Sequence, residues 1–295
     1  MSQTLKLQLF SAREITADNA RRQIEALSNF ENGVFRPQKC DTSEPLKEPF
    51  DPKDISEPIR WLLQPGADFK FKSSKPFRTE GYISNRHYPP MWTKEKSNGL
   101  LVPIIPAHPE PFFSISWTMW IDLSALRKLG VDLLARFATE MFVNAKAEYG
   151  FLTSESDHRA KNLLIKQLPS GATSSKFVGT DPEWGVPGLY WLNLFGPRYA
   201  PWLGIEVETV PGVLEKLKGG GISLRFGASP EEAESADVLA NEKKAIQIIG
   251  SEKFFDLGHP ERKPTPPSYI NSLAGDGKNR AVSEYYLKEI ASEST

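Results

Sequence analysis

Hydrophobic and polar positions alternate along several short stretches of the chain, and each such stretch predicts a β-strand. The longest is FFSISWTMWIDL (112–123), whose two-residue repeat predicts a long strand. One face of that strand carries large apolar side chains: Phe113, Ile115, Trp117, Met119 and Ile121. Shorter stretches predict further strands at 5–10, 69–72, 77–83, 100–106, 149–153, 188–195 and 221–227.

Apolar residues at helical spacing predict helices between these strands. Thr16 is placed to cap a helix over 16–30, in which Ile24, Leu27 and Phe30 form one stripe. Gly130 separates a short helix from a long one that starts at Val131. Further helices are predicted over 55–63, 156–168, 231–250 and 281–290. In the helix over 231–250, Ala240, Ala245 and Ile249 are expected to face inward.

Helices interposed between strands in this order predict an α+β fold, in which helices pack on a mostly antiparallel sheet. We expect two related lobes, separated at the proline-bounded turn AHPEP (107–111). The expected division is an N-terminal lobe over 1–108, a C-terminal lobe over 109–259, and a linker with a C-terminal helix over 260–295.

The aromatic stretch GLYWLNLFGPRYAPWLG (188–204) is interpreted as part of the fold's core rather than as a ligand box. Both faces of the strand over 188–195 are apolar, which is typical of a strand in the middle of a covered sheet. Strict alternation places Leu189, Trp191 and Asn193 on one side, opposite Tyr190, Leu192 and Leu194. Asn193 would need partners from nearby backbone groups, and Gly196-Pro197 ends the strand before a short helix.

Charge and cysteine content exclude several classes of partner and site. The 295 residues carry a formal net charge of −1 without a long basic run, so we expect no nucleic-acid partner. Cys40 is the single cysteine, which excludes an intramolecular disulfide and any multi-cysteine metal site, and fits a reducing compartment. With no membrane-length apolar run and no leader pattern in MSQTLKLQLF, we expect a cytoplasmic protein without a membrane partner.

The sequence shows no recognised catalytic, metal or cofactor motif. The four histidines stand in no HExxH frame and no pair has i, i+4 spacing, so no metal is expected. No serine lies in a G-x-S-x-G elbow, so no serine nucleophile is indicated. The segment KGGGIS (218–223) lacks the spacing of a phosphate-binding loop, so no nucleotide cofactor is indicated and its glycines are interpreted as a turn. Asp157 and His158 could form an acid–base pair, but their place at a helix start favours a capping role.

Four segments, in order and spacing, resemble small immunity proteins of bacterial polymorphic and type VI secretion toxin systems. They are FSISWTMWIDL, the helix ending in AEYGFLT, PGLYWLNLFGPRYAPWLG and GGGISLRFGASPEE. The pattern is most similar to the immunity protein 52 family, over residues 110–235. This resemblance implies an intracellular, non-catalytic protein that binds a cognate toxin and blocks its active site. It implies no particular contact residue.

Two surface segments are candidates for binding such a toxin. The loop ATSSKFVGTDPEWGVPG (172–188) combines an aromatic residue, Trp184, with Asp181 and Glu183. The alternative for Trp184 is that it folds back over a sheet edge. The second candidate is the acidic helix start with Glu231, Glu232 and Glu234, which would be complementary to the basic cleft of a nuclease toxin. The alternative is that these residues only complement the helix dipole.

Three functions remain open from the sequence. The favoured one is a toxin-neutralising immunity protein. The alternatives are a hydrolase with a dispersed active site that includes Asp157 and His158, and an interaction module with no toxin partner. The oligomeric state is not determined by the sequence.

Overall fold

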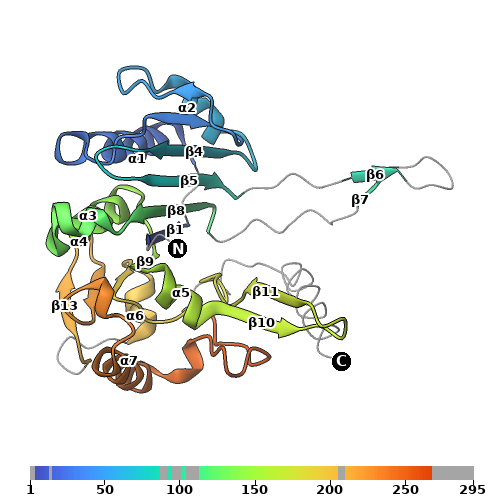
Figure 1. Cartoon of the computed structure of the whole chain (residues 1–295), viewed down its shortest axis with the longest axis vertical. Helices are drawn as coiled ribbons and strands as arrows, with labels where there is room; N and C mark the ends of the chain where they lie inside the picture. Colours follow the sequence, from blue (N-terminus) through green and yellow to red (C-terminus); the bar gives the residue numbers. More distant parts are fainter. Residues whose placement is uncertain are drawn as a thin grey trace.

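The computed structural model of the chain describes residues 4–12, 15–86, 92–94, 101–103, 113–204 and 210–267, with backbone alone for 92–94 and 101–103. These residues form an α+β fold built on a ten-stranded sheet in which every neighbouring pair is antiparallel. The strand order is β13-β14-β12-β9-β1-β8-β5-β4-β2-β3. Figure 1 shows this order running from the orange strands at the bottom to the blue strands at the top.

The strands of the large sheet are short, and the longest ones lie at its centre. They are β1 (Thr4–Ser11), β2 (Lys39–Asp41), β3 (Glu48–Pro49), β4 (Asp68–Ser73), β5 (Thr79–Asn85), β8 (Ile115–Asp122), β9 (Tyr149–Ser154), β12 (Leu192–Phe195), β13 (Val213–Lys216) and β14 (Ile222–Arg225). Two separate hairpins are formed by β6 (Trp92–Lys94) with β7 (Leu101–Pro103), and by β10 (Leu163–Gln167) with β11 (Thr173–Phe177). The first of these lies away from the sheet at the right of Figure 1.

Seven α-helices are found in the described part of the chain. They are α1 (Ala17–Asn29), α2 (Ser56–Leu62), α3 (Ser124–Leu129), α4 (Val131–Asn144), α5 (Glu155–Asn162), α6 (Tyr199–Leu203) and α7 (Ala236–Ile249). Short 3-10 turns occupy η1 (Phe30–Gly33), η2 (Pro230–Glu232) and η3 (Ser251–Lys253). The expected cap of α1 is confirmed, because the Thr16 side chain accepts the backbone N–H of Asn19 and the Asn19 side chain accepts that of Thr16.

The two faces of the sheet carry two hydrophobic clusters. The first face includes Leu5, Leu7 and Leu9 of β1, and the helices α1, α2, α3 and α4 pack on it. The second face includes Phe10 of β1, and the second cluster adds residues of α6 and α7 above β9, β12 and β14. Because successive side chains of a strand point to opposite faces, one strand contributes to both clusters.

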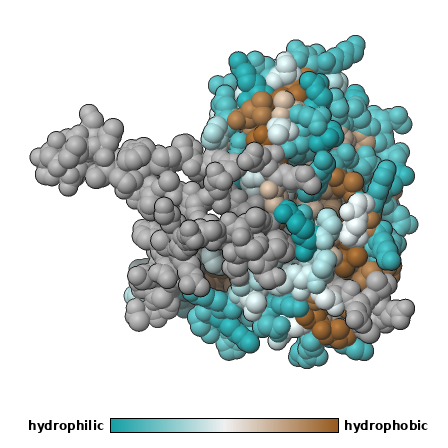
Figure 2. Space-filling model, turned by 180° about the vertical axis from the view of Figure 1, so that it is seen from behind, coloured by the Kyte–Doolittle hydropathy of each residue, from teal (hydrophilic) through white to brown (hydrophobic). Residues whose placement is uncertain are grey.

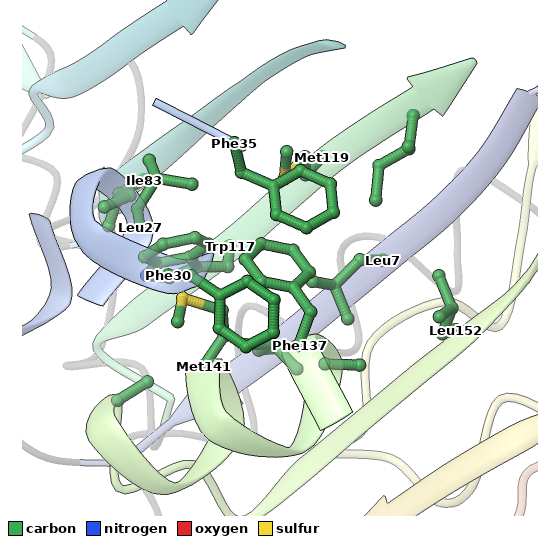
Figure 3. Close-up of a cluster of buried hydrophobic side chains, with 14 of the residues drawn as sticks. Leu7, Leu27, Phe30, Phe35, Ile83, Trp117, Met119, Phe137, Met141 and Leu152 are labelled. Atoms are coloured by element: carbon green, nitrogen blue, oxygen red, sulfur yellow. The ribbon is translucent and has the colours of Figure 1, made fainter. Parts of the chain in front are cut away.

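An aromatic group fills the space between the first face and helix α4. The rings of Phe30 and Phe35 contact Phe137 of α4, at centroid distances of 5.1 and 3.8 Å. Figure 3 shows these rings gathered above Leu7, Trp117 and Met119 of the sheet. The buried Trp117 indole donates a hydrogen bond of 2.5 Å to Gln23 Oε1, so its polar atom is satisfied inside this core.

The 188–204 stretch is core, as its composition indicates, but the expected alternation holds only in part. Trp191 is fully buried, yet it and Leu192 both join the first cluster, while Leu189 and Tyr190 join the second. The reason is that β12 begins only at Leu192, so the preceding residues do not follow strand geometry. Asn193 has the backbone partners it requires: it accepts from Tyr190 N and donates to the carbonyls of Tyr190 and Leu224.

Four other expectations need correction. The helix expected over 156–168 ends at Asn162, because Leu163–Gln167 form strand β10 and pair with β11. The segment expected as a loop over 172–188 therefore contains a strand, β11. The helix expected over 231–250 is divided into η2 and α7. Ala240 is exposed rather than inward, since the buried positions of α7 are Val238, Glu242, Ala245 and Ile249.

The sheet continues without a break across the expected lobe boundary. Strands β5 and β8 precede and follow residues 107–111 in the sequence, and they pair along their lengths. Two lobes are therefore not separate in the described structure, and the domain division stays a prediction. The turn at 107–111 and the helix expected over 281–290 lie outside the described residues.

The burial of Trp191 generates a stability prediction. Trp191→Ala should lower the free energy of unfolding by about 3–5 kcal/mol, because it empties a large site in the first cluster. Urea unfolding measures the change. Trp191→Phe is the matched control: it keeps a ring and removes a buried indole N–H that has no acceptor among the described residues, so it should cost clearly less. Equal stability of Trp191→Ala and the wild type would contradict the core assignment.

Candidate functional site

Asp157 and His158, the pair that could act in acid–base catalysis, are both buried, with exposed fractions of 0% and 1%. Asp157 lies in the first turn of α5, where its backbone N–H is capped by Ser154. Its carboxylate accepts a hydrogen bond of 2.7 Å from Thr153 Oγ1 and forms a 2.7 Å ion pair with Lys161 Nζ. The carboxylate is thus used within its own segment, rather than to orient the imidazole of His158.

Lys161 joins two buried carboxylates and a backbone carbonyl. Its Nζ lies 2.7 Å from Asp157 and 2.7 Å from Glu242 of α7, and it donates a 2.6 Å hydrogen bond to the carbonyl of Leu189. Burial raises the pKa of Asp157, and it raises the pKa of Glu242 to about 7, although Lys161 opposes both shifts. This cluster connects α5, α7 and the entry to β12 through one ammonium group.

His158 is enclosed by aromatic rings and a lysine. Its ring stacks on Phe151 and Phe177 at centroid distances of 5.5 and 4.9 Å. Lys6 Nζ of β1 lies 3.3 Å from both ring nitrogens. Burial lowers the pKa of His158 to about 3, with Lys6 adding to the effect, and burial lowers the pKa of Lys6 to about 8. The imidazole is therefore neutral near pH 7 and packs as a flat ring.

The same buried region fixes both ends of the loop over 178–187. The Asn162 side chain donates hydrogen bonds of 3.1 Å to the carbonyls of Val178 and Pro187. Its oxygen accepts a 2.6 Å hydrogen bond from the Tyr190 hydroxyl. One buried amide thus holds the two stems of the loop together, and its own orientation is set by a buried tyrosine.

Arg86, at the end of β5, holds the loop from its other side. Its guanidinium lies 2.8 Å from Asp181 and 4.0 Å from Glu183. Glu183 also accepts the backbone N–H of Phe113, next to β8, at 2.9 Å. Two of the three loop residues expected to contact a partner therefore fix the loop to the sheet. The sequence gives no signal for this role, since Arg86 lies 95 positions before Asp181.

Trp184, the third residue of that set, projects from the fixed loop. Its exposed fraction is 45%, so it does not fold back under the cover that an edge-capping role would require. Its backbone N–H donates to the carbonyl of Asp181, which closes a turn that contains both anchored acids. On the face shown in Figure 2, hydrophobic residues reach the described surface in separate patches among hydrophilic ones. An exposed tryptophan on a fixed loop is a candidate anchor for a partner.

The acidic candidates form a separate group. Glu231 and Glu232 lie on η2 and Glu234 follows in the turn before α7, and all three are exposed. Glu232 accepts the backbone N–H of Ala228, which is a local capping role. Within the described ranges, no hydrogen bond or ion pair joins these glutamates to Asp181, Glu183 or Trp184. The structure therefore presents two candidate surfaces and not one combined site.

In the parts of the chain that the structure describes, no three His, Cys, Asp or Glu side chains come together in a way that could hold a metal ion. None of the described helices has both the length and the apolar character needed to cross a membrane.

The raised pKa of Glu242 predicts a pH-dependent contribution to stability. Its ordinary value is 4.5 and its folded value is about 7, so between these pH values the folded protein holds a proton that the unfolded chain has lost. Stability from this group therefore falls as pH rises through that window. Glu242→Gln removes this titration. As pH rises from 5 to 7, the free energy of unfolding of the variant, measured relative to that of the wild type, should therefore increase by about 1–3 kcal/mol.

Urea unfolding at pH 5, 6 and 7 measures this difference. His158 acts in the opposite direction, since its lowered pKa removes stability as pH falls below 6.5, but it is present in both proteins and cancels in the comparison. Parallel stability curves for the two proteins would show that Glu242 does not titrate in this range.

The role of Asn162 predicts a local change in dynamics. Asn162→Ala removes both stem contacts, so backbone amides in 178–187 should exchange with solvent about tenfold faster or more. Hydrogen exchange read by mass spectrometry measures this. Asn144→Ala is the control, because that exposed amide bonds only to Glu140 of its own helix among the described contacts. Unchanged exchange in the loop would mean that other contacts hold it.

Comparison with solved structures gives a low-identity likeness. The Pseudomonas aeruginosa T6SS protein PA0821 matches with a TM-score of 0.48 and 12% sequence identity, over 84% of this chain and 72% of that chain. No family model and no curated protein sequence match this chain.

Proposed function

We propose that this chain is a non-catalytic immunity protein that binds and neutralises a bacterial toxin, with Trp184 as the anchor of the contact. The observation that carries the proposal is the exposed tryptophan on a loop fixed at both stems and at both acids. The segments over 110–235 that resemble the immunity protein 52 family support the same function.

The fixed loop is suited to tight binding. A partner that docks on a mobile loop must order it, and that ordering opposes association. Here Asn162 and Arg86 hold the loop before any partner arrives. Tryptophan is also the residue type most enriched among the side chains that dominate protein–protein affinity.

The use of Asp157 and His158 inside the fold supports a non-catalytic role. A general base must lie within hydrogen-bond reach of its substrate, and both side chains are covered by protein. Asp157 is occupied by Thr153 and Lys161, and His158 is stacked between two rings. This arrangement does not favour the alternative of a hydrolase that uses this pair.

The exposed glutamates at the start of α7 supply the second part of the proposed contact. Glu231, Glu232 and Glu234 present three carboxylates to solvent. A toxin that acts on nucleic acid has a basic cleft, and opposite charges across an interface raise the association rate. We place these residues at the rim of the complex rather than at its centre.

The first test is protection of cells that express the toxin. The candidate toxin is the C-terminal domain of a large secreted protein encoded by a neighbouring gene, and the lack of such a gene would count against the proposal. Trp184→Ala should weaken the complex about 30-fold or more, since loss of a central anchor costs about 2 kcal/mol or more. The triple change to Ala at 231, 232 and 234 should mainly slow association.

Matched variants separate these effects from general damage. Ile248→Ala removes another exposed apolar side chain, and a triple Glu→Ala at 25, 57 and 140 removes other exposed charges. Both controls should protect cells as the wild type does, and all variants should have unchanged unfolding midpoints. Full protection by folded Trp184→Ala and by the 231, 232, 234 variant would place the interface elsewhere. Failure of the wild type to bind the toxin would refute the function itself.

A further inference from the structure

Among the described residues, no helix packs on the second face of the sheet over its N-terminal half. The second hydrophobic cluster contains no residue of β4, β5 or β8, whereas the first face of the same strands is covered by helices. The side chains that alternate toward the second face are polar or amphipathic, and Lys70, Glu80, Tyr82 and Trp120 among them are half-buried. This half of the sheet therefore presents an aromatic and charged surface rather than a core.

A hollow of about 240 Å³ lies on this surface. Its lining includes Phe71 of β4, Tyr82 of β5 and Trp120 of β8. The ring centroids of Tyr82 and Trp120 are 6.0 Å apart at an interplanar angle of 53°. The strand register explains the pair, because Glu80 lies opposite Trp120 and Tyr82 is the next residue along β5 on the same face. No hydrogen bond from the Trp120 indole or the Tyr82 hydroxyl is found among the described residues.

Carboxylates dominate the charged lining of this hollow. Glu44, from the turn between β2 and β3, Asp68 and Glu80 supply three negative charges, and Lys70 is the one lysine or arginine in the lining. Lys70 Nζ is 4.0 Å from the Asp68 carboxylate. Glu80 forms a 2.8 Å ion pair with Arg78, which does not line the hollow. Ion pairs that are open to solvent contribute little, so an incoming cation can replace these contacts.

The shape and chemistry of the hollow fit one basic side chain. Aromatic faces attract cations, tryptophan most strongly, and neighbouring carboxylates add charge-assisted hydrogen bonds. A guanidinium is better matched than an ammonium, because its plane stacks on a ring while its fork reaches a carboxylate. The volume is below that of pockets which enclose a drug-sized ligand or cofactor.

We propose that this hollow receives an arginine side chain of the protein partner. The inference rests on the proposed function for the identity of that partner, and on the hollow itself for the chemistry. It adds a contact beyond the Trp184 loop and the exposed glutamates. Arg86, which holds that loop, follows β5, so Tyr82 lies four strand residues, roughly 13 Å, from the loop anchor. Arg86 also lies 5.9 Å from the ring of Phe10, a residue of the second face, so the loop anchor and the hollow belong to one side of the sheet.

The first experiment tests the hollow without the toxin. The full chain, labelled with ¹⁵N at its seven tryptophans, is titrated with N-acetyl-arginine amide, and the Trp120 indole signal is identified by its loss in Trp120→Phe. That signal should shift and saturate with a Kd on the order of 1 mM, as expected for one side chain. The neutral isostere N-acetyl-citrulline amide should give at most a tenth of the shift at equal concentration.

Variants of the carboxylates provide the controls. Glu80→Gln and Glu44→Gln should each weaken arginine binding at least threefold, while Glu57→Gln, an exposed change on α2, should leave it unchanged. Equal shifts with the arginine and citrulline compounds, or no shift of the Trp120 signal with arginine, would overturn the inference. Neither result depends on whether the toxin has been identified.

The second experiment uses the complex with the toxin. Glu80→Arg places a cation of this chain in the hollow and should weaken the complex at least tenfold, with the fold retained because Glu80 is on a face where no described helix packs. Wild-type affinity of folded Glu80→Arg would overturn the inference and leave the proposed function standing. A wild-type chain that does not bind the toxin would refute the proposed function, and the arginine titration would still decide the chemistry of the hollow.

Discussion

The fold depends on strand β1, which pairs with β8 on one side and β9 on the other. All the strands on the β8 side come from residues before 123, and all those on the β9 side from residues after 148, so this one strand joins the two halves of the sheet. Its alternating side chains also divide between the two clusters, with Leu7 in the first and Phe10 in the second. Loss of this pairing would separate the sheet and expose both cores at once.

Polar groups at the boundary of this core act as structural links between distant elements. Lys6 of β1 contacts His158, Lys161 connects Asp157 with Glu242, and Asn162 holds the two stems of one loop. Burial of such groups is costly unless each finds a partner, and here the partners come from different parts of the chain. The residues that most resemble catalytic ones therefore order the surface. The exposed features to which we assign partner contacts are the Trp184 loop and the hollow beside Trp120.

The candidate site could be predicted from the sequence only at the level of residue type. The combination of Trp184 with Asp181 and Glu183 marked the loop, because aromatic and acidic residues among Gly and Pro are typical of surface loops. The same pattern could not reveal that the acids bind Arg86, nor that Tyr82 and Trp120 meet on the second face. Those contacts join residues 38 to 97 positions apart, and nothing in the local pattern specifies which distant group each one meets.

The sequence by itself determined the elements whose apolar pattern is strong and local. The strand β8, the helices α1 and α4, the boundary between α3 and α4 at Gly130, and the buried character of 188–204 follow from periodicity, capping and composition. Tertiary structure decided where local preferences were weak: Leu163–Gln167 became a strand because β11 was available to pair, and strict alternation began only at Leu192 because β12 starts there. It also decided that Asp157 and His158 are enclosed, since burial depends on which distant elements cover a residue and not on the residue's neighbours in sequence.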